Sequence, residues 1–234
     1  MTEEKDLSIL YTKKFTCPIC EQSFESMKLR ESWLKVDRYE SDLNALYNGI
    51  QPSFYQVLVC PFCGYSAVES KYQKLKPAQK EQISKAIMGK WSGKSYGEER
   101  TLDEAIVTWM LALRIAELGH FSNVELGMYS LIVARLFRLK GDKESEMRFT
   151  KTSRDKLIEA YSEDEYGGFP AMHEGNTTYL IGELSRRIGD KKNASTYMGM
   201  AMKNDLVKSD PRLMDMTREQ WLLVKEMDDG KENI

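Results

Sequence analysis

The chain has 234 residues, of which 41% are apolar and 30% are charged, and its formal net charge is −2. This composition is typical of a soluble globular protein, and no apolar run reaches the roughly 18 residues of a membrane-spanning helix. The acidic start, Met1 to Asp6, lacks the apolar core of a signal peptide. We therefore expect a cytoplasmic protein without a membrane partner, long enough for a small module joined to a larger helical one.

Four cysteines, arranged in two C-x-x-C pairs, are the most informative residues of the chain. Each pair has a proline directly after its first cysteine, and 39 residues separate the two pairs. In a cytoplasm that keeps thiols reduced, this pattern favours metal binding over disulfides. Two such pairs are typical of a zinc ribbon, in which each pair lies on a tight hairpin turn. The predicted ligands of one structural zinc ion are Cys17, Cys20, Cys60 and Cys63.

The residues around the two pairs favour tight turns. Proline presets the backbone of a turn, and Gly64 supplies the positive φ that closes the second one. Glu21 stands at the equivalent place of the first turn, which is less favourable. A site with four protein ligands has no open position for a substrate, so its role is structural. A rubredoxin-like iron site is the first alternative, although Glu21 speaks against it, and a redox-active dithiol is the second.

The segment between the cysteine pairs is expected to supply further strands. Asn48-Gly49 is a turn signal. Residues 54–59 are rich in β-branched and aromatic side chains and predict a strand that leads into the second pair. Residues 27–36 fit either a short helix or a strand, and their candidate core side chains are Trp33, Leu34 and Val36.

From residue 71 onward the apolar residues have helical periodicity. Pro77 can open a first helix, and three glycines predict a loop over 89–100. Thr101 and Glu104 form a capping box at the start of a strongly apolar helix that ends near Gly119. An acidic loop at 162–170 interrupts the later helices, which are predicted from Ser122 or Asn123 to Gly141 and over 143–161, 171–188, 191–206 and 211–228.

Small residues near the end of the chain fall at the spacings of a tetratricopeptide helix pair. They are Gly182, Gly189, Ala194 and Ala201, with Met198 as the bulky residue of the pattern. Small side chains at such places let paired helices approach closely. We predict a tetratricopeptide-like antiparallel helical domain, with a generic antiparallel helical bundle as the alternative.

Several motifs in the first third of the chain resemble those of a bacterial family filed as a domain of unknown function. They are Cys17-Pro-Ile-Cys20, Tyr47-Asn-Gly-Ile-Gln-Pro52, Tyr55-Gln-Val57 and Cys60-Pro-Phe-Cys-Gly-Tyr65-Ser-Ala67. The family's basic-acidic stretch before Tyr47 is matched only loosely, by residues 38–42. Members pair an N-terminal zinc-ribbon-like region with a C-terminal tetratricopeptide-like helical region. The resemblance implies a bacterial cytoplasmic protein and a metal-binding role for the four cysteines, and it carries over no activity.

Enzyme signatures are sparse in this sequence. It has no Walker P-loop and no G-x-G-x-x-G, G-x-S-x-G or H-E-x-x-H motif. His120 follows Gly119 at a predicted helix end, where the helix dipole favours an imidazolium. His173, beside the acidic loop, is the candidate for a general base or a second metal ligand, without an evident partner. We therefore expect a protein that is not an enzyme.

Taken together, these patterns predict an α+β, mainly α, protein with a zinc-ribbon-like β module at 13–70 and an α-helical tetratricopeptide-like domain at 71–228. The first function hypothesis is a metal-binding adaptor whose helical domain binds a protein or peptide. The alternative is a nucleic-acid-binding or transcription-associated zinc-ribbon protein, because residues 71–100, from Lys71 through Lys94, hold 8 basic and 3 acidic residues. Aromatic residues near the cysteines form core under the first hypothesis and stack on bases under the second: Tyr39, Tyr47, Phe54, Tyr55, Phe62 and Tyr65.

Overall fold

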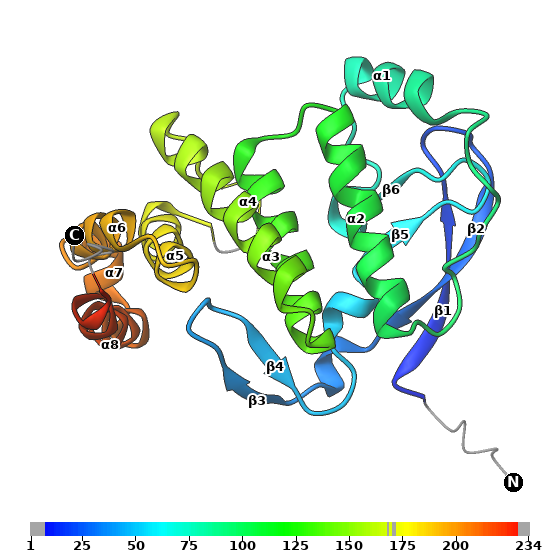
Figure 1. Cartoon of the computed structure of the whole chain (residues 1–234). Coiled ribbons are helices and arrows are strands. Elements are labelled where there is room, and N and C mark those ends of the chain that lie inside the picture. Colours follow the sequence, from blue (N-terminus) through cyan, green and yellow to red (C-terminus); the bar gives the residue numbers. More distant parts are fainter. Residues whose placement is uncertain (1–7, 168, 170–171, 229–234) are drawn as a thin grey trace, which may run out of the picture. The chain divides into compact units, whose positions relative to one another are not determined.

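The computed structural model in Figure 1 describes residues 8–167, 169 and 172–228. Its fold is α+β and mainly helical, as predicted, with short antiparallel strand pairs followed by helices. The chain forms two compact units. Of the described residues, the first unit contains those up to Arg38 together with Leu46–His120, and the second contains Tyr39–Ala45 together with those from Phe121 onward. Within the described ranges, no helix combines the length and apolar character needed to traverse a bilayer.

Two β-hairpins carry the cysteine pairs. Strand β1 (Leu10–Thr16) pairs antiparallel with β2 (Ser23–Leu29), and the first pair lies in the turn between them. Strand β5 (Val57–Val59) pairs antiparallel with β6 (Ser66–Val68), and the second pair lies in that turn. The strand predicted before the second pair is confirmed, but it is shorter than 54–59 because Pro52–Phe54 form a 3-10 turn.

Strands β3 (Val36–Tyr39) and β4 (Ala45–Tyr47) form a separate two-stranded sheet. The prediction that Trp33 and Val36 belong to the core is wrong, because their side chains are 46% and 39% exposed; Leu34 is only half-buried. Every residue of β3 is exposed, since a two-stranded ribbon buries little by itself.

Two helices complete the first unit, and both begin as predicted. Helix α1 (Pro77–Ile87) has its proline at the first helical position. Helix α2 (Leu102–Leu118) begins at a capping box, in which the backbone N–H of Glu104 donates to Thr101 Oγ1 and the backbone N–H of Thr101 donates to Glu104 Oε2, each at 3.2 Å.

Helix α2 belongs with the strands rather than with the later helices. It packs against β5 and β6, and the indole N–H of Trp109 donates to the carbonyl oxygen of Ser53 at 2.7 Å. Trp109 is fully buried in this position. The first unit therefore extends to residue 120, which differs from the boundary at residue 70 that the sequence suggested, because the strands bury their apolar side chains against this helix.

Among the described residues, the second unit has six helices. They are α3 (Asn123–Lys140), α4 (Lys143–Ser162), α5 (Glu174–Arg187), α6 (Lys191–Ala201), α7 (Asp205–Ser209) and α8 (Pro211–Glu226).

The ends of these helices follow local capping residues. Ser122 caps α3, and Gly141, with φ +79°, ends it. Two boundaries differ from the predictions. Helix α5 begins at Glu174, after His173 as its N-cap, and the predicted start at 171 lies outside the described residues. The predicted helix 191–206 is divided into α6 and α7 because the side chain of Asn204 caps a new helix.

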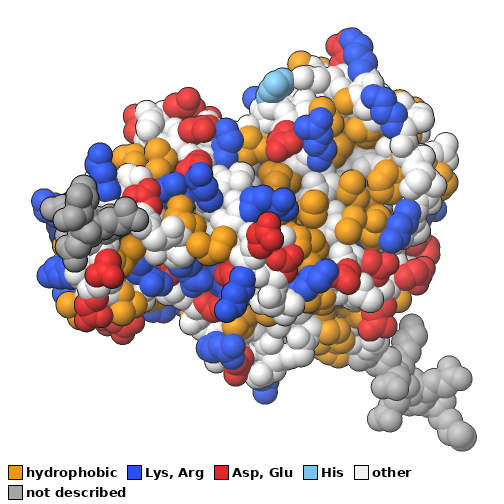
Figure 2. Space-filling view, viewed as in Figure 1, with side chains coloured by type: hydrophobic (Ala, Val, Ile, Leu, Met, Phe, Trp, Pro, Cys, Tyr) orange, Lys and Arg blue, Asp and Glu red, His pale blue; other side chains and the backbone are white. Residues whose placement is uncertain are grey.

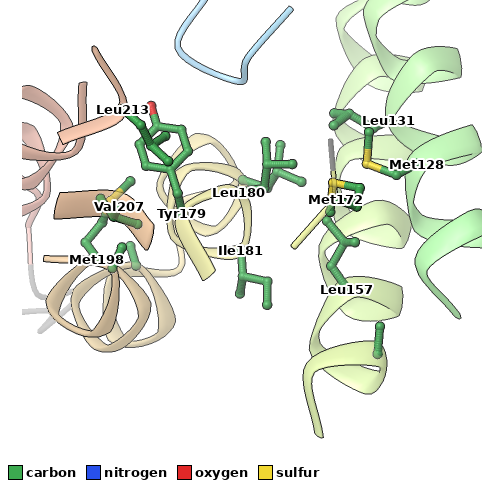
Figure 3. Close-up of a cluster of buried hydrophobic side chains, with 14 of the residues drawn as sticks. Met128, Leu131, Leu157, Met172, Tyr179, Leu180, Ile181, Met198, Val207 and Leu213 are labelled. Carbon is green, nitrogen blue, oxygen red and sulfur yellow. The ribbon is translucent and has the colours of Figure 1, made fainter. Parts of the chain in front are cut away.

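The core of the second unit runs through its helices, as Figure 3 shows. Helix α4 packs against α3 and α5, and α6 packs against α5 and α8. Fully buried side chains such as Leu157, Leu180 and Met198 link them. Helices α5 and α6 lie very close together, since a Cβ atom on Gly182 would be 2.9 Å from Met198 Cγ. A small residue, Gly182, therefore lies where these two helices approach each other.

Candidate metal centre

The two cysteine-bearing turns have the same backbone hydrogen bonds. The N–H of Glu21 donates to the Cys17 carbonyl, and the N–H of Gly64 donates to the Cys60 carbonyl, each at 2.9 Å. Gly64 has the expected positive φ of +76°. Glu21 has φ +61°, a left-handed conformation that costs a non-glycine residue about 1–2 kcal/mol. The same turn is thus built twice, and backbone strain lies only in the first copy.

The structure brings all four predicted cysteine sulfurs together. The four Sγ atoms lie within 4.8 Å of one another. The Sγ–Sγ distance is 3.6 Å between Cys17 and Cys63 and also between Cys20 and Cys60, far longer than a disulfide bond. A tetrahedral zinc ion with Zn–S bonds of about 2.3 Å needs sulfurs about 3.8 Å apart. The spacing therefore fits a metal ion held by four cysteines.

The electrostatics of the cluster indicate a place for a cation. Hydrogen bonds from Cys60 and Cys63 lower the pKa of Cys17 to about 2. The hydrogen bond to Cys17 raises the pKa of Cys60 to about 12 and also raises the pKa of Cys63. Cys17 is thus the thiolate, and it accepts hydrogen bonds from the protonated thiols of Cys60 and Cys63. All four sulfurs can be thiolates together only if a cation replaces those protons.

Backbone N–H groups point at the sulfurs in both turns. Those of Ile19 and Cys20 interact with Cys17, and those of Phe62 and Cys63 interact with Cys60. In each turn the donors belong to the second and third residues after the first cysteine of the pair. The sulfurs of Cys17 and Cys60 therefore have equivalent backbone donors. Such donors offset part of the negative charge that four thiolates bring to a buried site.

The second turn is covered by an indole ring. Trp91 packs on Gly64, where a Cβ atom would lie 2.5 Å from Trp91 Cε3. Its indole N–H donates to the Pro61 carbonyl at 3.0 Å. Glycine is therefore required twice at position 64, by its positive φ and by the close approach of the ring.

The aromatic residues predicted near the cysteines have different environments. Tyr55 and Tyr65 are buried, Tyr47 and Phe54 are half-buried, and Phe62 at the tip of the second turn is 56% exposed. Tyr39 is also exposed, but it belongs to the second unit, where the guanidinium of Arg212 lies over its ring. The cysteine cluster therefore has a buried aromatic side and one exposed aromatic tip.

An open pocket of about 380 Å³ lies beside the second turn. Helices α1 and α2 contribute apolar wall residues such as Ile87 and Leu111, and Trp91 and Cys63 also line it. Figure 2 shows hydrophobic side chains gathered on the face beneath α1 and beside α2. Lys90 and Arg114 are the two charged residues of the lining, and both are exposed. The lining of the pocket therefore combines apolar side chains with two exposed cations.

Both histidines of the chain, including the candidate His173, take part in local structure. His173 Nδ1 accepts a hydrogen bond from the backbone N–H of Asn176 at 3.3 Å, which caps α5. His120 follows α2 with φ +48°, and its Nε2 lies 2.8 Å from Gln82 Nε2. Across the described residues, the four cysteines are the group of His, Cys, Asp or Glu side chains spaced to hold a metal ion. The structure therefore brings neither histidine into such a group.

The acidic loop at 162–170 contributes carboxylates to the start of α3. Glu165 Oε2 accepts from the backbone N–H of Asn123 at 2.8 Å, and Glu163 Oε2 accepts from the Asn123 side-chain amide at 3.2 Å. Carboxylates are favourable at a helix N-terminus. Residues 168 and 170 of this loop lie outside the described residues.

A buried acid in the second unit was missed by the sequence reasoning. The side chain of Asp42 is fully buried, and its Oδ2 lies 3.0 Å from Arg138 Nη2 and 3.5 Å from Arg135 Nε. Arg187 Nη1 lies 3.9 Å from the same oxygen. Burial alone would raise the pKa of Asp42, but the charges of Arg135, Arg187 and Arg138 outweigh burial and hold the pKa well below its usual range.

Comparisons with known proteins give a family without an assigned activity. A family model described as "Uncharacterized protein conserved in bacteria (DUF2225)" matches residues 10–224. An uncharacterized protein of Borreliella burgdorferi is 27% identical over 127 residues, which cover 47% of this chain and 44% of that relative. The chain thus matches less than half of the relative's length. No solved structure matches the chain.

Proposed function

This chain belongs to the bacterial DUF2225 family, and from that premise we propose that it is a non-enzymatic, metal-binding adaptor of the cytoplasm. A structural zinc ion held by Cys17, Cys20, Cys60 and Cys63 would stabilise the first unit, and the chain would bind a protein or peptide partner. The observation that carries this proposal is the cluster of four sulfurs within 4.8 Å of one another.

The chemistry of the four ligands supports zinc and a structural role. Zinc prefers four-coordinate thiolate sites, and a site closed by four cysteines leaves no coordination position for a substrate. A bound zinc ion would cross-link the two hairpins, because each hairpin provides one pair of the ligands. The cross-link would contribute folding free energy. The runner-up is a rubredoxin-like iron ion, and the strained Glu21 in place of glycine disfavours that reading.

Metal analysis of the purified protein tests the metal. We expect one zinc per chain and no visible absorption; one iron per chain with visible absorption would replace zinc with iron. The double variant Cys60→Ser, Cys63→Ser should lose the metal and unfold the first unit. Ser23→Ala, at an exposed position of the first hairpin, is the matched control and should keep both. Metal-free wild-type protein with an unchanged melting temperature would contradict the structural role.

The pocket beside the second turn supports the interaction part of the proposal. Its apolar walls suit an apolar side chain of a partner, and Lys90 and Arg114 suit an acidic residue next to it. Phe62 adds an exposed aromatic anchor at the tip of the same turn. The close α5–α6 pair supports the tetratricopeptide-like part of the proposal, since such pairs commonly present binding surfaces.

Affinity purification from the native host tests the adaptor. Tagged wild-type protein, the double variant Phe62→Ala, Lys90→Glu, and Leu222→Ala are compared, each with and without nuclease. Leu222 is 59% exposed on α8 and serves as the matched control. We expect one nuclease-resistant partner with wild type and the control but not with the double variant. Equal recovery with all three proteins would contradict docking at the second turn.

The nucleic-acid alternative receives less support from the basic segment 71–100. Lys80, Lys85 and Lys94 lie 3.8, 2.5 and 3.9 Å from glutamate carboxylates. Arg100 is buried and donates to the backbone carbonyls of Phe54 and Val57. At least half of the eight cations of this segment therefore have protein partners. Two results together would establish the alternative. The recovered material would be lost on nuclease treatment, and the affinity for single-stranded nucleic acid would fall steeply between about 50 and about 200 mM salt.

A further inference from the structure

Tyr72 lies in the aromatic side of the cysteine cluster. Its side chain is 1% exposed. Its ring packs against two neighbours, with a centroid distance of 4.9 Å to Tyr65 and an edge contact at 6.1 Å to Phe24. The Tyr65 hydroxyl also donates to the Tyr72 carbonyl at 3.1 Å. The ring of Tyr72 is thus held by its aromatic neighbours and its backbone by a hydrogen bond. These contacts fix the position of its hydroxyl oxygen.

The hydroxyl of Tyr72 is a buried polar group that still needs a partner. Its oxygen makes no hydrogen bond of ordinary geometry with the described residues. Buried hydroxyls are nearly always hydrogen-bonded, so an unpaired one points to a group that completes it. Its polar neighbours are Cys17 and Cys60. The interaction with Cys17 is of the hydrogen-bond kind, and a phenolic O–H is a ready donor.

We propose that Tyr72 is a positioning residue of the metal centre, whose phenolic O–H donates a hydrogen bond to the thiolate sulfur of Cys17. This inference rests on the proposed metal site and adds to it a side chain that the sequence reasoning did not select. Cys17 would then receive a side-chain donor in addition to the backbone donors of Ile19 and Cys20.

The physical consequence is that Cys17 holds its negative charge more easily. A hydrogen bond from a neutral donor to an ionised sulfur is charge-assisted and is strongest where water is excluded. Cys17 is fully buried, so water cannot replace the phenol as a donor. Groups that hydrogen-bond to metal ligands typically change metal affinity by about 10–100-fold. Tyr72 should therefore strengthen metal binding without touching the metal.

The test uses the full chain and removes one oxygen. Tyr72→Phe keeps the ring that packs on Phe24 and Tyr65. Zinc affinity is measured by competition with a chromophoric chelator, and cobalt-loaded protein reports the sulfur-to-metal charge-transfer band. We expect Tyr72→Phe to bind zinc about 10–100-fold more weakly and to shift that band, with an unchanged far-ultraviolet circular dichroism spectrum. Equal zinc affinity and an unshifted band would overturn the proposal.

Tyr55→Phe is the matched control. It removes a buried hydroxyl from the same unit, one that accepts a hydrogen bond from the backbone N–H of Arg100 at 3.1 Å. We expect it to lower thermal stability and to leave zinc affinity within about twofold. An equal loss of affinity in both variants would mean that packing, not the hydrogen bond, acts on the site, and would also overturn the proposal.

A second measurement needs no variant. In zinc-loaded wild-type protein, a hydroxyl proton bonded to a buried sulfur should exchange slowly enough to give its own NMR signal near the Tyr72 ring protons. Its absence would count against the hydrogen bond even if Tyr72→Phe failed to fold. Wild-type protein that binds no zinc at all would instead overturn the proposed metal site, so the two failures are distinguishable.

Discussion

Replacing Asp42 by alanine should strongly destabilise the second unit. The side chain of Asp42 is fully buried and faces three arginines from α3 and α5. Arg138 keeps Glu40 and Glu146 as ion-pair partners, at 2.8 and 2.6 Å, if Asp42 is removed. Arg135, whose side chain is only 14% exposed, pairs with Asp42 alone among the described carboxylates within 4 Å. The variant therefore leaves one largely buried cation without a carboxylate partner, and Arg135 keeps only its hydrogen bond to the backbone carbonyl of residue 42.

The size of the effect follows from that unpaired cation. Removing one member of a buried ion pair costs about 3–5 kcal/mol, a large part of the roughly 5–15 kcal/mol that stabilises a typical protein. For a chain of this length, each kcal/mol lowers the melting temperature by about 2–4 °C. We expect Asp42→Ala to melt roughly 6–20 °C below wild type. The conservative variant Asp42→Asn keeps the shape of the side chain but not its charge. Its melting temperature should lie between those of wild type and Asp42→Ala.

Urea unfolding followed by circular dichroism measures this loss. Asp37→Ala is the matched control because Asp37 has the same side chain on the same hairpin and an exposed partner, Arg38, at 2.8 Å. Exposed pairs contribute little, so the control should lie within about 0.5 kcal/mol of wild type. The reasoning would be refuted if Asp42→Ala and Asp37→Ala had the same free energy of unfolding.

The contribution of Asp42 should also depend on pH. Its pKa in the folded protein lies well below the usual value of the unfolded chain, because the three arginines outweigh burial. A lowered folded pKa stabilises the protein at every pH above the unfolded value, about 3.9, and the stabilisation is lost as the pH falls toward the folded pKa. The stability difference between wild type and Asp42→Asn should therefore be full at pH 6 and shrink below about pH 4. If the stability difference between wild type and Asp42→Asn grew as the pH fell, the folded pKa of Asp42 would not be lowered.

Four further substitutions have expected outcomes that thermal melts can check. Glu21→Gly should raise the free energy of unfolding by about 0.5–1 kcal/mol by relieving the left-handed conformation, and a loss of stability would argue against strain there. Gly64→Ala should lower it by about 2–3 kcal/mol, since its Cβ would lie 2.5 Å from the indole ring on that turn, and an unchanged melt would disprove the close approach. Gly182→Ala should cost about 1–3 kcal/mol against Met198, whereas Gly199→Ala, with 3.9 Å of clearance, should be neutral or stabilising; equal effects would show that the helices can shift apart.

The cysteine-bearing turns and the starts of α1, α2 and α3 were predictable because their signals are local. Each cysteine pair, its proline and the residue that closes its turn lie within five neighbouring positions, and backbone geometry alone specifies the turn. The capping box at Thr101 and Glu104 is equally local, and it forms as predicted. The assembly of the two pairs into one cluster followed from ligand chemistry rather than from folding rules, because four thiolates are the set that zinc prefers.

The failures concern contacts between distant parts of the chain. Trp33, in the 3-10 turn Glu31–Trp33, and Val36, in β3, were assigned to the core from side-chain type alone, but the two-stranded sheet of β3 and β4 is too small to bury them. Asp42 was overlooked because Arg135 and Arg138 lie 93 and 96 residues further along the chain. One signal was available: these two arginines lie three residues apart in the largely apolar helix α3, and cations at such places are usually paired with an acid.

Residues 39–45 belong to the second unit, although the chain on both sides of them belongs to the first. Leu43 in this segment has φ +64°, a left-handed conformation that is unfavourable for leucine. Helix α5 holds the segment in place, because the Tyr179 hydroxyl donates to the Ser41 carbonyl at 2.6 Å. Neither unit is therefore a continuous piece of the gene. A single recombination crossover cannot exchange one unit and leave the other whole, because a fragment starting at residue 121 would carry the arginines without their acid. The two units are expected to have been inherited together, and the family match over residues 10–224 spans both.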